Sequence, residues 1–189
     1  MIETILEYDK ELFLFLNNLG NPTWDGFWMS YTNKVNWIPF YLLLLFLMFK
    51  KLDRKTLLLI ILLAPLMILF TDQITNLFKD GFERLRPCRE ESMEGHMRMV
   101  KDYCGKFGFF SGHSSNSMAI AVFAGLVLKP YFKKLVFILL FWAALMAYSR
   151  IYIGVHYPLD IVSGMLFGAF AGWMFYKFKG YLTQRFISS

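Results

Sequence analysis

The sequence is short of charge. Asp, Glu, Lys and Arg make up only 18% of its 189 residues, whereas 57% are apolar and 19% aromatic. Soluble domains carry roughly 25% charged residues. A soluble fold of this size covers its surface with polar side chains, yet several stretches of about 17 to 25 residues contain almost none. The shortage of charge therefore excludes an ordinary soluble domain and predicts an integral membrane protein.

Cysteine is also scarce. The two cysteines, Cys88 and Cys104, form no CxxC pair of the kind that binds zinc. No group of side chains resembles a carboxylate cage for magnesium or a three-ligand zinc site, so we expect no metal and no other cofactor. The N-terminus lacks the basic segment and small-residue cleavage site of a signal peptide, and we expect it to be retained.

Five apolar runs and one amphipathic segment organise the chain. At about 20 residues per crossing, five crossings leave little room for a separate soluble domain. Residues 2–18 place apolar side chains on one helical stripe, which predicts an interfacial helix within residues 1–22. We therefore expect an all-α integral membrane protein, a bundle of five or six transmembrane helices in a single domain, residues 1–189. The expected crossings cover about 34–49 (with 24–31 as a candidate extension), 56–78, 114–128, 135–147 and 161–175.

The net charge of +6 arises from short basic clusters between the apolar runs, so we expect no nucleic-acid partner. On one side of the membrane the joints carry ten basic residues and only Asp53 as an acid, which predicts the cytoplasmic side. We expect a multi-pass membrane protein, with the 79–110 loop on the side opposite the cytoplasm. The ten basic residues are Lys50, Lys51, Arg54, Lys55, Lys129, Lys133, Lys134, Lys177, Lys179 and Arg185.

Three short polar motifs are expected on the opposite, extracytoplasmic side. In the first, KDGFERLRP, Lys79 and Arg86 lie seven residues apart, or about two helical turns, and Pro87 is expected to end the helix just after Arg86. Two cations on one side of a helix end can bind a phosphate. The alternative is an ordinary basic pair that anchors the helix among lipid headgroups.

The second motif, FSGHSSNS, covers residues 110–117, immediately before an apolar run. Ser114 or Ser115 can cap the helix, and Gly112 lets the backbone approach a ligand. Free N–H groups at the helix start would point toward an anion, with His113 beside it. The alternative is an ordinary turn, because Ser and Gly serve any entry into a helix.

The third motif, SRIYIGVHYPLD, contains Ser149, Arg150, His156 and Asp160. Pro158 suits a first helical turn, so the carboxylate of Asp160 can reach the imidazole of His156 four residues earlier. A carboxylate on one ring nitrogen leaves the other free as a nucleophile or base. The alternative is a hydrogen-bonded pair that secures a helix start, although an Arg at a membrane boundary favours an anionic partner.

Together the motifs supply two of the three histidines, three cations and two helix N-termini at one membrane surface. Phosphoryl transfer through a phosphohistidine requires positioning, charge neutralisation, a nucleophile and an acid, which these groups offer. We expect a lipid phosphate as substrate, since such a lipid is already anchored at headgroup level, and we infer no protein partner.

In residues and order, the motifs resemble the signatures of the type 2 phosphatidic acid phosphatase family, membrane lipid phosphatases related to vanadium-dependent haloperoxidases. The family signatures read K-x6-RP, PSGH and SR-x5-H-x3-D, and this chain matches them at 79–87, 110–113 and 149–160. The resemblance covers about residues 72–175 and favours the compact bacterial members with five or six membrane helices. It therefore implies a multi-pass protein of a bacterial inner membrane whose active site faces the periplasm or exterior. One departure is Phe110, which replaces the family's usual Pro and removes a fixed φ angle.

The resemblance implies a role for each matched residue. His156 would be the nucleophile that takes the phosphoryl group, and Asp160 would orient it. His113 would protonate the leaving lipid oxygen and then help to activate water. The phosphate oxygens would be bound by Lys79, Arg86, Ser111, the Gly112 amide, Ser149 and Arg150. No metal is implied.

The resemblance leaves the lipid open among undecaprenyl pyrophosphate, phosphatidylglycerophosphate, phosphatidic acid and lipid A phosphates. We expect undecaprenyl pyrophosphate first, because a compact chain resembles general-purpose members, and lipid A next. The 79–110 loop carries mixed charges, so it is either a headgroup-selecting element or a solvated lid. A disulfide between Cys88 and Cys104 is expected if this loop is extracytoplasmic.

Another class of function fits the same motifs. A non-catalytic protein that binds or transports a lipid phosphate would use a similar cationic pocket. Such a carrier requires cations, but it requires neither a histidine with its own carboxylate nor a second histidine before a helix. A soluble haloperoxidase-like chemistry is disfavoured by the apolar runs.

Overall fold

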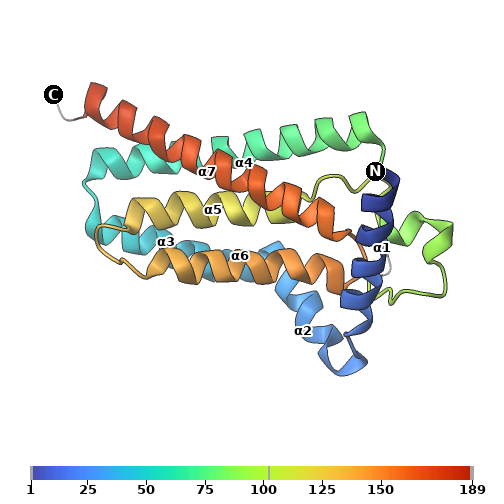
Figure 1. Ribbon diagram of the computed structural model, residues 1–189. Coiled ribbons are helices and arrows are strands. Elements are labelled where there is room, and N and C mark those ends of the chain that lie inside the picture. Colours follow the sequence, from blue (N-terminus) through green and yellow to red (C-terminus); the bar gives the residue numbers. More distant parts are fainter. Residues whose placement is uncertain (1, 102, 188–189) are drawn as a thin grey trace.

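The structure is a helical bundle with a loop-rich end (Figure 1). The computed structural model describes residues 2–101 and 103–187, and no β-strand forms in these two ranges. The predicted all-α class is confirmed. The α-helices are α1 (Ile2–Asn18), α2 (Pro22–Thr32), α3 (Ile38–Lys51), α4 (Arg54–Phe82), α5 (Gly112–Leu128), α6 (Leu135–Tyr152) and α7 (Pro158–Phe186). Short 3-10 helices are η1 (Lys34–Trp37), η2 (Pro87–Arg89) and η3 (Glu91–Met93).

Three helices, α4, α6 and α7, are long and apolar enough to cross a bilayer. A fourth candidate span consists of α2 followed by η1 and α3, and it is bent by 65° at the break. The break lies at Asn33, whose side chain accepts the N–H of Val35 and so starts a new helix. The apolar helix α5 has 17 residues and is shorter than α4, α6 and α7. The aromatic segment before the first apolar run therefore belongs to the same candidate span as that run.

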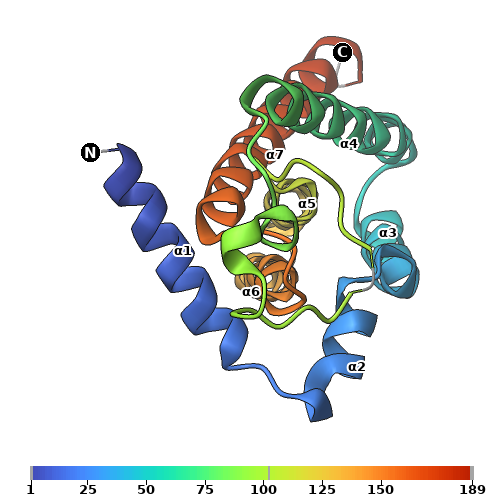
Figure 2. The same ribbon diagram turned by 90° about the vertical axis from the view of Figure 1, so that its right-hand side faces the viewer.

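The central helix of the bundle is α5, and α7 packs closely against it (Figure 2). Gly164, Gly168 and Gly172 lie one turn apart on the contact face of α7. A Cβ atom at Gly164 would lie 2.6 Å from the carbonyl oxygen of Ser111, and one at Gly172 would lie 2.5 Å from that of Ala119. Small residues let two helix backbones approach in this way. The stripe thereby holds the start of α5 against the start of α7, where two of the motifs lie.

The N-terminal helix α1 runs across the end of the bundle instead of along it (Figures 1 and 2). Ile2 and Ile5 are exposed apolar residues on this helix, as an interfacial location requires. Its buried residues, Asp9, Phe13 and Asn17, follow one another at intervals of about one turn. Since two of these three are polar, hydrogen bonds as well as apolar packing hold α1 to the bundle.

The helix that carries Lys79 ends earlier than predicted. α4 stops at Phe82, and Glu83 turns the chain with a left-handed φ of 47°. Segments 84–86 and 106–108 then pair through two backbone hydrogen bonds. The prediction that the helix continues to the proline was wrong, because this pairing replaces the last helical turn. The two cations of the first motif therefore come from different elements.

Candidate active site

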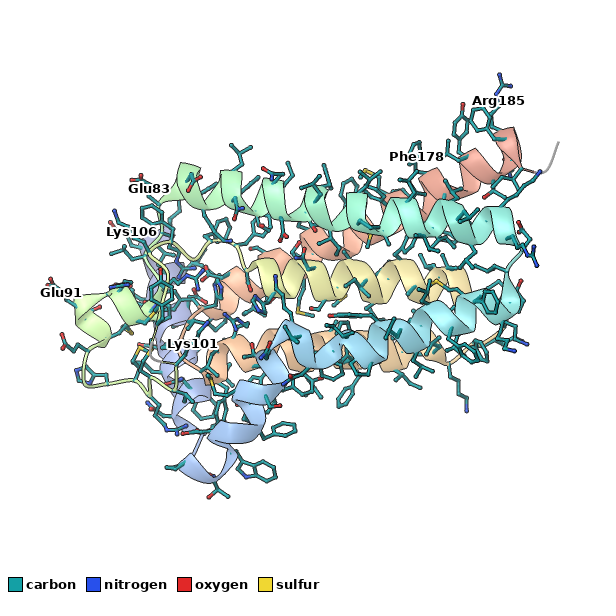
Figure 3. All side chains as sticks on the ribbon, turned by 180° about the vertical axis from the view of Figure 1, so that it is seen from behind. Glu83, Glu91, Lys101, Lys106, Phe178 and Arg185 are labelled. Carbon is teal, nitrogen blue, oxygen red and sulfur yellow. A yellow bond between two sulfur atoms is a disulfide. The ribbon has the colours of Figure 1, made fainter. Side chains whose placement is uncertain are left out.

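The structure brings the three motifs to one end of the bundle, as predicted. The first motif spans the C-terminal end of α4, the second begins α5, and the third joins α6 to α7. This end also carries α1 and the 79–110 loop (Figure 1). In Figure 3, Glu83, Lys101 and Lys106 lie at this end and Arg185 at the opposite one. Lys79 and Asp160, which are 81 positions apart in the chain, thus lie at the same end.

His156 and Asp160 form the predicted pair. Nδ1 of His156 lies 3.2 Å from Oδ2 of Asp160, and the two residues are 2% and 0% exposed. The same carboxylate oxygen accepts the N–H of Tyr157 at 3.1 Å, and Pro158 occupies the first turn of α7. Because the carboxylate holds the proton on Nδ1, Nε2 keeps a free electron pair. The geometry therefore leaves Nε2 able to act as a nucleophile.

Burial lowers the pKa of His156 well below its ordinary value, and the nearby charges of Arg86, Arg150 and Lys79 lower it further. The imidazole is therefore neutral near pH 7, as a nucleophilic nitrogen must be. Three cations around a neutral histidine also leave an excess of positive charge. That excess makes the space next to the histidine attractive to a phosphate.

The start of α5 offers backbone amides to an anion. The side-chain oxygen of Ser111 accepts the N–H of Ser114 at 3.4 Å, so Ser111 is the N-cap of α5. The predicted caps, Ser114 and Ser115, were wrong, since both lie inside the helix that Ser111 begins. A Cβ atom at Gly112 would lie 3.8 Å from Nζ of Lys79. The first amides of α5 and the ammonium of Lys79 thus face a common position, which suits a phosphate.

Arg150 is buried with unused hydrogen-bonding capacity. It lies in the last turn of α6 and is 4% exposed. Its Nη1 donates to Oγ1 of Thr32 at 2.6 Å, but its buried Nε has no partner among the described residues. Native structures pair almost all buried donors, and a buried charge without a counterion is costly. The orphaned donor therefore indicates an anionic ligand.

The loop segment around Gly108 positions Arg86. Nε of Arg86 donates to the carbonyl oxygen of Phe107 at 2.8 Å. A Cβ atom at Gly108 would lie 3.2 Å from Cγ of Arg86 and 2.8 Å from Oδ2 of Asp160. Gly108 thus lies between the cation of the first motif and the carboxylate of the third. Only a residue without a side chain fits there undisturbed, and the motifs gave no signal for it.

Two motif residues differ from the expectation. The hydroxyl of Ser149 donates to the carbonyl oxygen of Met146 at 2.6 Å, so its hydrogen is not directed toward the phosphate position. Phe110 is 4% exposed, and its ring packs against Phe78 and Phe167 at centroid distances of 5.0 and 5.2 Å. Aromatic packing therefore holds this turn where a proline would fix a dihedral angle.

Several charged residues that the motifs did not indicate also reach the site. Nη1 of Arg84 donates to Oδ1 of Asp160 at 2.9 Å, and Arg84 in turn contacts Asp9 of α1. Lys34 of η1 and His113 line one cavity of about 260 Å³. Arg84 stands at an unmatched position of the first motif, and Asp9 and Lys34 precede all three motifs. Their proximity arises only from the folded chain.

An apolar groove of about 550 Å³ leads toward this cavity between α3 and α4. Its lining includes Leu44, Met48, Ile60 and Phe123, with Asp72 at its polar end. The groove and the smaller cavity with His113 share three lining residues, Tyr41, Ile68 and Ile120. An acyl chain can therefore lie in the groove while the headgroup of the same molecule reaches the cations.

Cys88 and Cys104 form a disulfide, with their Cα atoms 6.4 Å apart. The guanidinium of Arg89 donates twice to the carbonyl oxygen of Cys104, at 2.7 and 3.1 Å. The expected bond is thus present in the structure. The disulfide joins the segment directly after Arg86 to the segment 104–108, which contacts the side chain of Arg86.

Comparison with known proteins gives matches over most of the chain. Residues 57–184 match the model of the PAP2 superfamily. The lipid A 4'-phosphatase of Bacteroides thetaiotaomicron is 35% identical over 188 residues, which are 98% of this chain and 83% of that protein. The lipid A 4'-phosphatase of Porphyromonas gingivalis is 34% identical over 192 residues, 100% of this chain and 80% of that protein.

Two solved structures are similar to this one. The crystal structure of Aquifex aeolicus LpxE has a TM-score of 0.68 and 27% identity, and the match covers 88% of this chain and 93% of that one. The structure of a transmembrane PAP2-type phosphatidylglycerolphosphate phosphatase from Bacillus subtilis has a TM-score of 0.76 and 20% identity, over 95% and 88%. At that identity, the second likeness shows the fold alone.

Proposed function

The chain belongs to the PAP2 superfamily and is a membrane lipid phosphatase, and on this basis we propose that it removes a phosphate ester from a lipid A-type glycolipid through a phosphohistidine at His156. One observation supports the chemistry above all: the buried, unpaired Nε of Arg150 lies among the cations around a neutral histidine that has its own carboxylate. A carrier would require the cations but not the His156–Asp160 pair.

In the first step, Nε2 of His156 attacks the phosphorus atom. The N–P bond forms as the bond from phosphorus to the lipid oxygen breaks. Burial and nearby cations lower the pKa of His113 in the empty site, so His113 takes up its proton when the anionic phosphate binds and offsets those cations, and it gives this proton to the lipid oxygen. Asp160 stabilises the positive charge that develops on the imidazole. The charge on the transferring oxygens is met by Lys79, Arg86, Arg150 and the first amides of α5.

In the second step, water takes the place of the lipid. His113, now neutral, accepts a proton from the water molecule as its oxygen attacks the phosphorus atom. The N–P bond breaks, its electron pair returns to His156, and inorganic phosphate leaves. The two histidines thereby regain their starting protonation states, so no external reductant, oxidant or metal is needed to balance the reaction.

The choice of a glycolipid rests on the two relatives that match nearly the whole chain and on one carboxylate. Asp72 lies at the polar end of the apolar groove, where Oδ1 accepts a hydrogen bond from Asn116 at 2.8 Å. That oxygen would lie 3.9 Å from a Cβ atom at Gly112, next to the proposed phosphate position. Sugar hydroxyl and amide groups can donate to such a carboxylate. A polyprenyl chain has no donors there.

Undecaprenyl pyrophosphate, the first expectation from the sequence, remains the second candidate because the cations would bind its pyrophosphate equally well. The site end is proposed to face the periplasm, since the opposite end carries the ten basic residues of the cytoplasmic joints. Lipid A phosphates and polyprenyl pyrophosphates are both available to a site with that orientation. The substrate panel therefore decides between them.

The test is phosphate release by the purified protein in detergent micelles. The panel contains lipid A with its 4'-phosphate, phosphatidylglycerophosphate, phosphatidic acid and undecaprenyl pyrophosphate, each with and without a chelator. We expect the largest kcat/KM on lipid A, and losses of roughly 10³-fold or more for His156→Ala and about 10²- to 10⁴-fold for His113→Ala. Asp72→Ala should weaken lipid A turnover more than polyprenyl turnover.

The outcomes separate the parts of the proposal. If His156→Ala retains wild-type turnover while its melting temperature is unchanged, the assigned nucleophile is wrong. A preference for undecaprenyl pyrophosphate would leave the chemistry in place and replace the substrate. Acid-labile, base-stable labelling of wild type but not of His156→Ala by a phosphate-labelled lipid would support the covalent intermediate.

A further inference from the structure

The N-terminal helix contributes a buried carboxylate to the site. Asp9 is 4% exposed, although residues 2–8, which precede it in the same helix, are all exposed. Its Oδ1 accepts the N–H of Leu159 at 2.8 Å, and its Oδ2 accepts Nη2 of Arg84 at 2.5 Å. Leu159 directly precedes Asp160. One side chain of α1 therefore holds both an arginine and the backbone beside the catalytic carboxylate.

Arg84 links Asp9 to Asp160. Its Nη1 donates to Oδ1 of Asp160 at 2.9 Å, and its guanidinium carbon lies 4.4 Å from the ring centroid of Tyr157. Oδ2 of Asp160 is taken by His156 and by the N–H of Tyr157. Each oxygen of Asp160 thus has its own donors. Charge alternates along the series, from Asp9 to Arg84 to Asp160, and ends at the imidazole.

A second link from α1 supports the first. Lys10 forms an ion pair with Glu90, and Glu90 accepts the hydroxyl of Tyr157 at 2.6 Å. The ring of Tyr157 is thereby fixed against Arg84. Asp9 thus holds the backbone of Leu159, and Lys10 holds the side chain of Tyr157 through Glu90, on either side of Pro158.

We propose that Asp9 and Arg84 are positioning residues for phosphoryl transfer, which act on His156 through Asp160. This inference rests on the proposed role of His156 as the nucleophile. The positive charge of Arg84 partly neutralises the carboxylate of Asp160 and makes it a weaker acceptor for the Nδ1 proton. The negative charge of Asp9 offsets part of that effect. The helix α1 is therefore part of the catalytic apparatus as well as a membrane anchor.

A second arginine–carboxylate pair at the same end provides the contrast. Arg98 donates to both oxygens of Asp25, at 2.8 and 2.9 Å, and the two side chains are 24% and 28% exposed. This pair joins α2 to the loop without contacting the histidine–carboxylate pair. The side chains of Asp9 and Asp160 are only 2% and 0% exposed. A buried ion pair adds little net stability, so attachment of a helix does not require one.

Removing the charge of Asp9 and removing the charge of Arg84 should change the basicity of His156 in opposite directions. In Asp9→Asn, Arg84 acts on Asp160 without its counterion, so the imidazole becomes less basic and the acid limb of the kcat/KM profile moves to lower pH. In Arg84→Gln, Asp160 regains its full charge and the limb moves to higher pH. The other charged or titratable groups that face this cluster are unchanged in both variants: Lys79, Arg86, Arg150, His113, Glu90 and Tyr157.

The experiment compares pH profiles of wild type, Asp9→Asn, Arg84→Gln and the double variant, with lipid A as substrate in micelles. We expect limb shifts of roughly half a pH unit in opposite directions and kcat losses of about tenfold, with KM changed less than about twofold. In the double variant Asp9→Asn should add nothing to Arg84→Gln, since its target is absent. Asp25→Asn is the matched control, and it should shift neither limb.

The inference is overturned if all variants keep the wild-type limbs and lose activity only in proportion to folded protein. If Asp9→Asn does not fold, Arg84→Lys provides the test, because it retains the positive charge that Arg84→Gln removes. Its acid limb should lie closer to the wild-type position than that of Arg84→Gln, and a limb that stays at the Arg84→Gln position contradicts the inference. Turnover by His156→Ala would instead contradict the proposed function. An inactive His156→Ala together with an unshifted Asp9→Asn contradicts only the role of α1.

Discussion

The two ends of the bundle use charged residues in opposite ways. At the end away from the motifs, lysines and arginines are exposed at the joints between α3 and α4 and between α5 and α6. Lys51 lies about 6 Å from the ring centroids of Tyr131 and Phe132, and Lys50 lies 5.5 Å from that of Phe46, so their contacts are with aromatic faces. These charged side chains are exposed, and none of them forms an ion pair within residues 2–101 and 103–187.

At the motif end, charge is buried and directed. Arg150, His156 and Asp160 are each at most 4% exposed. Both carboxylate oxygens of Asp160 are held by hydrogen bonds from neighbouring groups. A solvated lysine acts through net charge, so one can replace another. A buried guanidinium or carboxylate acts through the position of its atoms, and no neighbour can replace it. The two ends should therefore respond differently to substitution.

The strongest test of this difference is Arg150. Arg150→Ala removes the unpaired buried donor and should lower kcat/KM by about 10²- to 10³-fold, the cost of losing one preorganised donor to a transition-state oxygen. Arg150→Lys keeps the charge but not the planar fork, and should remain well below wild type. Initial rates on lipid A and phosphatidic acid measure both.

Thr32→Val is the matched control for Arg150. It removes the hydroxyl that accepts Nη1 at 2.6 Å and leaves the guanidinium in place. Its activity loss should be far smaller than that of Arg150→Ala. If the two variants lose activity equally, Arg150 serves to hold α2 rather than phosphate.

An intermediate effect is expected at Gly108. In Gly108→Ala the new methyl group would lie 2.8 Å from Oδ2 of Asp160 and 3.2 Å from Cγ of Arg86, so one of these side chains must move. Displacing a catalytic group by a fraction of an ångström should reduce kcat by roughly 10- to 100-fold. The thermal unfolding midpoint should change little, because the site lies outside the apolar core.

Gly105→Ala sharpens that prediction within the same segment. Its Cβ would lie 3.5 Å from the guanidinium carbon of Arg86, an ordinary van der Waals distance. Activity close to wild type is expected. Equal losses at the two glycines would mean that the segment is sensitive to any side chain and that the contact with Asp160 is not the cause.

The outline of the fold was predictable because its signals are local. Apolar runs mark the helices, and the spacing of His156 and Asp160 around Pro158 fixes their contact within one turn. The predicted helix boundaries were wrong at two places. Ser111, not Ser114 or Ser115, caps α5, and α4 ends before the proline because segments 84–86 and 106–108 pair with each other. Short-range patterns therefore located the motifs but not all of their boundaries.

The contacts that surround the motifs could not be predicted in this way. Asp9 and Arg84 are separated by 75 residues, and Arg84 and Asp160 by 76. Asp9 lies on an amphipathic helix whose pattern predicts only a membrane surface location. Nothing in the spacing of these residues indicates that α1 turns back across the end of the bundle. Their role depends on tertiary packing, which a single sequence does not encode as a pattern.

The smallest effect on catalysis is expected at the opposite end. Lys133→Gln together with Lys134→Gln removes two exposed charges from the joint between α5 and α6. The kcat and KM of the purified variant should stay within about twofold of wild type, as for most surface substitutions. Rates measured in micelles, normalised to folded protein, provide the comparison with the variants of the motif end.

Neutralising six of the ten basic residues at this end should reduce the number of active molecules and leave their rate unchanged. With Lys50, Lys51, Arg54 and Lys55 also replaced by Gln, the charge asymmetry on which the proposed orientation rests is weakened. Protease accessibility of the 79–110 loop in intact cells would then report a mixed orientation, while kcat per purified molecule would remain near wild type. A fall in kcat itself would contradict the separation of the two ends, because it would show that solvated lysines far from the motifs act on the chemistry.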